Sequence, residues 1–260
     1  MSCSVLCYSK NKMKSNQKTA DPVFDHPRLV QVYDAFDPDR LDLVPYVSLA
    51  KQYKAQTVVD LGCGTGVLAL ILVEKGINVT AVDPARNSLA MAQSKTGAER
   101  VQWVHGDSQD IPKTKTGMLF MTGNTAQAII RDEDWKAMLG NVKKALRKDG
   151  LFVFETRNPE FEGWKEWTKE LSYQKIHIPV VGTVETWVDL IEAELPHVSF
   201  RWTWIFHEDG ARLTSVSRIR FRSRSEVEKD LTEAGFELVD VREAPDRPGK
   251  EMVFLAKSTN

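Results

Sequence analysis

Two carboxylates and three glycines stand at a spacing that suits ligand binding. Asp60 lies just before Gly62, Gly64 and Gly66, and Asp83 follows the first of these glycines by about 20 residues, where a nucleotide-binding βαβ unit places its ribose-binding acid. Glycines at alternate positions remove side chains from a turn, so a ligand can lie against the backbone. An acid before that turn suits an ammonium group and disfavours a pyrophosphate. The pattern predicts a site for a ligand with a cationic group and a ribose.

The segments around these residues predict a strand, a glycine turn, a helix and a second strand. Residues 57–61 are mostly β-branched and apolar, as in a strand buried on both faces. Residues 67–75 form an apolar run that suits a helix, and Gly76 suits its end. Residues 78–83 read as the next strand. The spacing Gly-x-Gly-x-Gly differs from the Gly-x-Gly-x-x-Gly of dinucleotide folds, which argues against an NAD-dependent oxidoreductase.

The sequences VVDLGCGTG (58–66) and AVDP (81–84) resemble those of the class I S-adenosylmethionine-dependent methyltransferases. The resemblance covers roughly residues 28–150. From Ser225 onward it extends only to the pattern of a helix followed by two strands. It implies an α/β fold, a Rossmann-like seven-stranded mixed sheet with helices on both faces. It also implies S-adenosyl-L-methionine as cofactor and S-adenosyl-L-homocysteine as product.

The same resemblance implies roles for individual residues. The three glycines would wrap the methionine end of the cofactor, Asp60 would face its amino group directly or through water, and Asp83 would hold the ribose hydroxyls. Asp107 would lie beside the adenine amino group, although it could instead cap the turn that follows. Tyr33 resembles the tyrosine of an entrance helix that covers cofactor and substrate, and it could equally be a core aromatic.

Together, motif, resemblance and position at strand ends predict these cofactor contacts: Tyr33, Asp60, Gly62, Cys63, Gly64, Thr65, Gly66, Asp83, Pro84, Asp107, Ser108, Thr122, Gly123 and Asn124. Candidate contacts to the methyl acceptor are Tyr33, Gln127, Glu155 and Arg157. Glu155 and Arg157 could instead form a structural ion pair. No metal ligand is predicted, because no histidine or cysteine falls at metal-ligand spacing. No catalytic residue is predicted either, because a sulfonium methyl group is already activated and a general base is optional.

Beyond the motif, alternating patterns predict further strands at 101–105, 118–121, 151–156, 236–242 and 252–256. Helices are predicted at 87–94, 132–148 and from Ser225 to Gly235. Residues 21–157 and 225–260 would then form the methyltransferase domain, preceded by a disordered tail over residues 1–20. Met13 in that tail is an alternative start of the protein.

The helix and strand alternation stops over residues 158–224, where aromatic residues alternate with polar ones. This pattern predicts an antiparallel β insertion, which would act as a substrate lid or as a dimer sheet. Arg218, Arg220 and Arg222 would share one face of its last strand. They could bind an anionic substrate or the RNA backbone, or form a solvated face paired with acids.

The formal net charge of -1 gives no general attraction to nucleic acid or to an anionic membrane. Three cysteines make no disulfide framework, so the cytoplasm is the expected location. The motifs of DNA methyltransferases are absent, namely Asn-Pro-Pro-Tyr and the Pro-Cys nucleophile. We therefore expect methyl transfer to an N or O atom of a small molecule, by a monomer or homodimer. The alternatives are an RNA-modifying methyltransferase and a non-catalytic cofactor-binding protein of the same fold.

Overall fold

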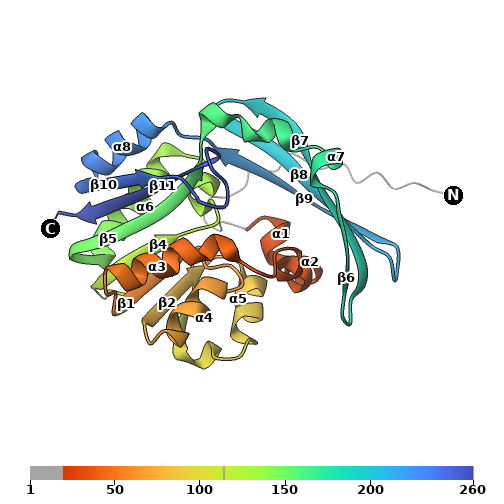
Figure 1. Cartoon of the computed structure of the whole chain (residues 1–260), viewed down its shortest axis with the longest axis horizontal. Coiled ribbons are helices and arrows are strands. Elements are labelled where there is room, and N and C mark those ends of the chain that lie inside the picture. The colour runs from red at the N-terminus through yellow and green to blue at the C-terminus, as the bar shows by residue number, and fades with distance from the viewer. Residues whose placement is uncertain (1–19, 114, 260) are drawn as a thin grey trace, which may run out of the picture.

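The computed structural model describes residues 20–113 and 115–259, and its main layer is a seven-stranded mixed sheet (Figure 1). The strand order is β10-β11-β5-β4-β1-β2-β3. Strands β10 and β11 are antiparallel to their neighbours, and the other five are parallel. The strands are β1 (Thr57–Leu61), β2 (Asn78–Asp83), β3 (Val101–His105), β4 (Thr116–Met121), β5 (Leu146–Arg157), β10 (Phe236–Arg242) and β11 (Glu251–Ser258). The predicted Rossmann-like sheet is confirmed.

Helices cover both faces of this sheet, as predicted. On one face α3 and α4 contribute to a core with the apolar side chains of β1, β4 and β5. On the other face α6 and α8 pack over a second core that contains Trp135, Phe152 and Phe154. The helices are α1 (Pro22–Asp25), α2 (Pro27–Tyr33), α3 (Val44–Gln52), α4 (Val67–Glu74), α5 (Arg86–Gln93), α6 (Asp132–Ala145), α7 (Lys169–Ser172) and α8 (Arg224–Glu233).

Two helix boundaries differ from the sequence prediction. Helix α6 ends at Ala145 rather than at residue 148, because the buried Leu146 has an extended backbone and pairs with Thr116 of β4. Helix α8 starts at Arg224, and its N-cap is Ser223, whose hydroxyl accepts from the backbone N–H of Glu226. The Glu226 carboxylate in turn accepts from the Ser223 N–H, which completes a capping box.

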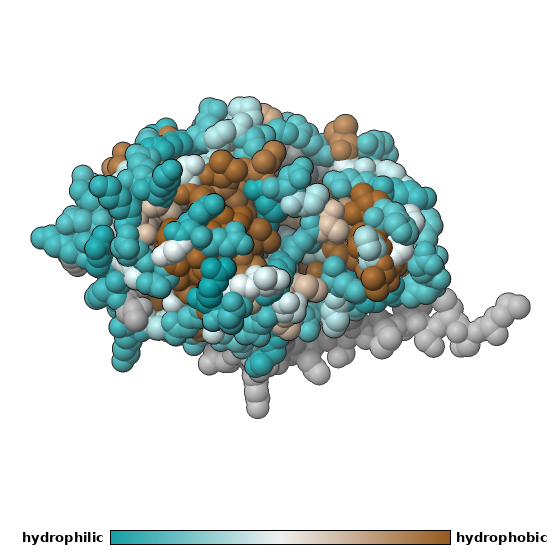
Figure 2. All heavy atoms as spheres, turned by 60° about the horizontal axis from the view of Figure 1, so that its bottom comes forward, coloured by the Kyte–Doolittle hydropathy of each residue, from teal (hydrophilic) through white to brown (hydrophobic). Residues whose placement is uncertain are grey.

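The chain between β5 and α8 forms a second, four-stranded antiparallel sheet in the order β6-β7-β8-β9. Two small cores lie against it, one formed with α1 and α2 and the other around Trp164 and Phe221. On the face shown in Figure 2, hydrophobic residues gather in two patches separated by hydrophilic ones. The strands are β6 (Gln174–Ile178), β7 (Gly182–Glu194), β8 (His197–Phe206) and β9 (Ala211–Arg220).

Helices α1 and α2 join the two sheets at the carboxyl ends of the parallel strands (Figure 1). On the side of the large sheet, Asp25 accepts from the backbone N–H of Asn87 in α5 at 2.8 Å. On the side of the small sheet, Arg28 forms an ion pair with Asp209 and lies 4.0 Å from the ring centroid of Phe206. The disordered tail predicted over residues 1–20 lies outside the described residues except for Ala20.

Candidate cofactor and acceptor site

The turn between β1 and α4, called here the glycine turn (residues 62–66), depends on three glycines with positive φ. These angles are +79° at Gly62, +53° at Gly64 and +77° at Gly66, in the left-handed region that side chains rarely adopt. A Cβ at Gly62 would lie 2.4 Å from Thr125, and one at Gly66 would lie 2.5 Å from Trp103. No described atom lies within 4 Å of a Cβ at Gly64. Gly62 and Gly66 therefore permit close packing, whereas Gly64 borders open space that a ligand can occupy.

Asp60, at the end of β1, is a buried carboxylate whose partner is missing. Its side chain is 1% exposed, and neither oxygen has a hydrogen-bond partner among the described residues. Burial, and then the nearby charge of Asp83, raise the pKa of Asp60 to about 7, while Arg40 opposes the shift. An unpaired buried carboxylate costs free energy unless a cation or donor reaches it. The site is thus suited to a ligand ammonium group.

Asp83, at the end of β2, holds the glycine turn from the opposite side. Its Oδ2 accepts from the Gly64 N–H and its Oδ1 from the Ala85 N–H, both at 2.8 Å. Burial raises the pKa of Asp83, and these two N–H donors oppose the shift. A carboxylate offers about four lone-pair positions, so acceptor capacity remains for ligand hydroxyl groups.

The entrance segment carrying Tyr33 is tied to the glycine turn through Asp34. The Thr65 hydroxyl donates to Asp34 Oδ1 at 2.6 Å, and Lys95 Nζ donates to Asp34 Oδ2 at 2.6 Å and to the Thr65 carbonyl at 2.7 Å. Tyr33 is 40% exposed, and its ring is tilted against that of Phe24 with 5.9 Å between the ring centroids. The Thr65 side chain is therefore engaged within the protein, and Tyr33 remains free to cover a ligand.

The remaining motif residues lie around the ends of β1, β2 and β3. Asp107 Oδ1 accepts from the Gln109 N–H in the turn after β3, and the expected contact of Asp107 with the adenine amino group stays a prediction. Ser108 accepts from Asn141 and the Pro84 carbonyl contacts His105. Burial chiefly raises the pKa of the Cys63 thiol well above its ordinary value, so it is a poor nucleophile.

The segment after β4, called here the β4 loop (residues 122–125), forms the next wall of the site. Gly123 and Asn124 have φ of +64° and +57°, and both donate their backbone N–H to Glu155 Oε1. Thr122 is 9% exposed, and its carbonyl accepts from the Thr125 hydroxyl at 2.8 Å. The β4 loop thus lies between the glycine turn and the end of β5.

Arg157 and Gln127 come together, but Glu155 does not join them. Arg157 Nη1 donates to Gln127 Oε1 at 2.9 Å, and its guanidinium lies 5.5 Å from the ring centroid of Trp167. Glu155 forms a structural ion pair with Arg247 at 3.4 Å, whereas no ion pair of Arg157 is found among the described residues. Burial lowers the pKa of Arg157, with the nearby Glu251 opposing the shift.

Two of the three arginines at the end of β9 and just after it, Arg220 and Arg222, make contacts within the protein. Arg222 is 3% exposed, donates to the Ile129 carbonyl and lies 4.4 Å from the ring centroid of Trp135. Arg220 forms an ion pair with Asp132 at 2.6 Å. Only Arg218 of the three is exposed. The expectation of a shared surface row is therefore wrong, and the RNA alternative loses its main support.

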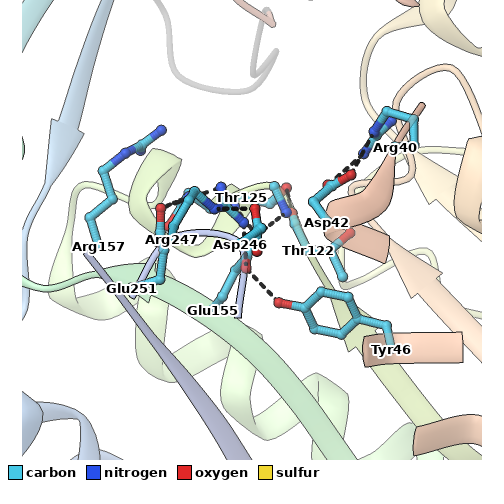
Figure 3. A network of polar contacts seen from close by, with 12 residues as sticks. Arg40, Asp42, Tyr46, Thr122, Thr125, Glu155, Arg157, Asp246, Arg247 and Glu251 are labelled. Atoms are coloured by element: carbon cyan, nitrogen blue, oxygen red, sulfur yellow. Dashed lines mark hydrogen bonds and ion pairs between the residues drawn. The ribbon is translucent and has the colours of Figure 1, made fainter. Parts of the chain in front are cut away.

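Three residues of the site region were missed by the sequence analysis: Tyr46, Arg247 and Glu251. Figure 3 shows Tyr46 of α3 and Arg247, from the connection between β10 and β11, at Glu155, and Glu251 at the start of β11 beside Arg247. They lie about 90 to 110 residues from Glu155 along the chain and carry no motif, so no local signal marks them. In the described ranges no group of three or more His, Cys, Asp or Glu side chains is arranged to hold a metal ion.

Comparison with known proteins identifies the core of this site. A family model described as "Methyltransferase domain" matches residues 58–150, which include the glycine turn, Asp83 and the β4 loop. Residues 58–150 therefore match a methyltransferase domain, in agreement with the resemblance seen in the motif. No described helix of this chain is long and apolar enough to cross a bilayer.

One similar curated protein is the cypemycin N-terminal methyltransferase of a Streptomyces species. It is 35% identical over 122 residues, which are 46% of this chain and 50% of that protein, so the likeness spans about half of each. A solved structure of an S-adenosylmethionine-dependent methyltransferase from Clostridium acetobutylicum shares the methyltransferase fold, with a TM-score of 0.71. It is 18% identical and covers 90% of this chain and 99% of its own. The sugar N-methyltransferase KedS8 from Streptoalloteichus has a TM-score of 0.69, is 13% identical and covers 100% of both chains.

Proposed function

We propose that this protein transfers a methyl group from S-adenosyl-L-methionine to an N or O atom of a small molecule. The observation that carries the proposal is Asp60, a buried carboxylate without a partner among the described residues, beside the open space over Gly64. A cofactor with an α-amino group supplies the missing cation. Asp83 and the backbone of the glycine turn would hold the ribose and the amino acid end.

When bound, the cofactor supplies a methyl group already activated on a sulfonium sulfur, so the protein mainly binds, orients and excludes water. Helices α1 and α2, with Tyr33 at the end of α2, would limit access of water to the site. An amine acceptor needs only to be neutral, whereas a hydroxyl acceptor also needs a base to take its proton. No side chain of the described site is assigned as that base.

On the acceptor side, the paired Gln127 and Arg157 support an acceptor that carries an anionic or strongly hydrogen-bonding group. The Arg157 guanidinium keeps unused donors beside the flat face of Trp167, and five N–H donors of an arginine suit a carboxylate or phosphate. One of the similar proteins is named a sugar N-methyltransferase and another an N-terminal methyltransferase, which supports an amine as the first acceptor to try. An acceptor screen should pair amines with and without a carboxylate, because equal turnover of both kinds would remove Arg157 from substrate binding.

Calorimetric titration with S-adenosylmethionine, S-adenosylhomocysteine and NAD tests the proposed cofactor. We expect micromolar binding of the two sulfur compounds and no binding of NAD. If a folded sample binds neither sulfur compound, the proposed function is rejected.

Asp83→Ala is expected to weaken binding of S-adenosylhomocysteine by roughly 10- to 100-fold, because a buried carboxylate that accepts ribose hydrogen bonds contributes about 1.5 to 3 kcal/mol. In the wild type the Gly64 N–H donates to Asp83, so the substitution also removes this hydrogen bond. Calorimetry measures the affinity, and Glu74→Ala is a control that removes an exposed acid at the end of α4 that lies farther from the glycine turn. Unchanged affinity in Asp83→Ala would exclude Asp83 from the cofactor site.

The proposal also includes the domain bounds, the role of the insertion, the cellular location and the oligomeric state. Residues 21–157 and 225–260 are assigned to the methyltransferase domain, and residues 158–224 to an insertion that acts as a substrate lid or as a dimer sheet. A cytoplasmic location, no DNA partner and a monomeric or homodimeric state are retained as proposals. RNA as substrate is disfavoured by the burial of Arg222 and the ion pair of Arg220.

A further inference from the structure

Glu155 lies beneath the β4 loop, where four donors surround its carboxylate (Figure 3). Oε1 accepts from the backbone N–H groups of Gly123 at 2.7 Å and Asn124 at 3.3 Å. Oε2 accepts from the Tyr46 hydroxyl at 2.5 Å and from Arg247 Nη2 at 3.4 Å. Because Glu155 is 1% exposed, water does not compete for these contacts.

The backbone of the β4 loop needs such an acceptor. Gly123 and Asn124 are consecutive residues with left-handed φ of +64° and +57°. Consecutive backbone N–H groups that converge in this way form a concavity for an anion, and Glu155 supplies the anion from within the protein. Asn124 is buried, so its N–H, if left unpaired, would favour a different loop conformation.

The β4 loop in turn contacts the glycine turn. A Cβ built at Gly62 would lie 2.4 Å from Thr125 Cγ2, so the Thr125 side chain fills the space directly over Gly62. The Thr125 hydroxyl is held by the Thr122 carbonyl at 2.8 Å. A displacement of the β4 loop therefore reaches the wall of the cofactor site, because closely packed groups do not move independently.

We propose that Glu155 is a positioning residue that fixes the β4 loop against the glycine turn and thereby shapes the cofactor site. Tyr46 and Arg247 hold its second oxygen, so α3 and the connection between β10 and β11 support the same loop. This inference rests on the proposed function only where it expects Glu155 to affect cofactor affinity. A buried carboxylate is a weak source of stability in itself, and fixing one conformation is a role that such groups can have.

The test uses the full chain with Glu155→Gln and Tyr46→Phe. The amide oxygen of a glutamine can still accept hydrogen bonds from the β4 loop without a charge, but its NH₂ group cannot accept a hydrogen bond from the Tyr46 hydroxyl. We expect the amides of Gly123 and Asn124 to exchange with solvent at least tenfold faster in Glu155→Gln, and S-adenosylhomocysteine to bind five- to twentyfold more weakly. Tyr46→Phe should change both quantities in the same direction by a smaller factor. Tyr53→Phe, the same substitution just after the end of α3, should change neither.

A solely structural role would lower global stability while the folded variant kept normal exchange at Gly123 and Asn124 and normal affinity, and that result would overturn the proposal. Faster exchange with unchanged affinity would also overturn it, because the loop would then not shape the cofactor site. If Glu155→Gln does not fold, Tyr46→Phe decides by the same two measurements. Failure of the wild-type protein to bind S-adenosylhomocysteine rejects the proposed function, whereas unchanged exchange in the variants rejects the role of Glu155.

Discussion

Asp60→Asn is expected to weaken S-adenosylhomocysteine binding by roughly 10- to 100-fold, because the charge-assisted hydrogen bond to the ligand ammonium group is lost, at a cost of about 1.5 to 3 kcal/mol. Calorimetry at pH 8 measures this loss. Asp149→Asn is the control, since it removes the same charge from an exposed position at the start of β5, away from the proposed cofactor site. An Asp60→Asn variant with wild-type affinity would show that the ammonium group is not bound by Asp60.

The same variant should be more stable than the wild type when no ligand is bound. The pKa of Asp60 in the folded protein is about 7, above the ordinary value of 3.8, so Asp60 ionisation makes folding less favourable as the pH rises from about 4 to 7. At pH 8 the neutral amide avoids this penalty, and we expect the free energy of unfolding to rise by about 1 to 4 kcal/mol. Urea denaturation at pH 4 and pH 8 should show the difference only at pH 8. Equal differences at both pH values would refute the assigned cause.

Cofactor affinity should also depend on pH. Below about pH 7 a proton must leave Asp60 before the ammonium group can pair with it, so wild-type affinity should fall by up to about tenfold per pH unit. Asp60→Asn should lack this dependence over the same range.

Gly64→Val is expected to reduce S-adenosylhomocysteine affinity at least about a hundredfold while the protein remains folded. The open space at Gly64 accepts the valine side chain, which then occupies the position where the cofactor would lie. The φ of +53° makes the substitution strained, with a cost of about 1 to 2 kcal/mol in stability. Calorimetry and thermal unfolding measure the two effects separately.

Gly76→Val provides a matched control for this substitution. Gly76 has a φ of +79°, and no described atom lies within 4 Å of its Cβ position, so the strain and the free space are similar. It lies at the opposite edge of the sheet from the cofactor site, before β2. We expect a comparable loss of stability with normal binding. Normal binding by Gly64→Val itself would mean that the ligand does not pass over the glycine turn.

The local structure of the proposed cofactor site was predictable because it is contiguous in sequence. Residues 57–83 form one strand, turn, helix and strand as predicted, and the three glycines lie in the turn with left-handed φ. The parallel pairing of β1 with β2 then brings Asp60 and Asp83 to the same edge of the sheet. Periodicity likewise predicted the seven strands, and it erred mainly at boundaries such as Ala145, where the burial of Leu146 against β4 overrode helix propensity.

Tertiary structure alone decided what the polar residues after β4 and β5 do. Glu155 stood at a strand end and suggested a substrate contact, but Tyr46 and Arg247, 109 and 92 residues away in sequence, converge on it. Arg220 and Arg222 alternated like surface residues, but both donate to carbonyls of the segment before α6, and Arg222 is buried there. A sequence pattern reports the period and the chemical type of a side chain. Whether a charge meets solvent, a ligand or a buried partner depends on elements distant in sequence that only the folded chain brings together.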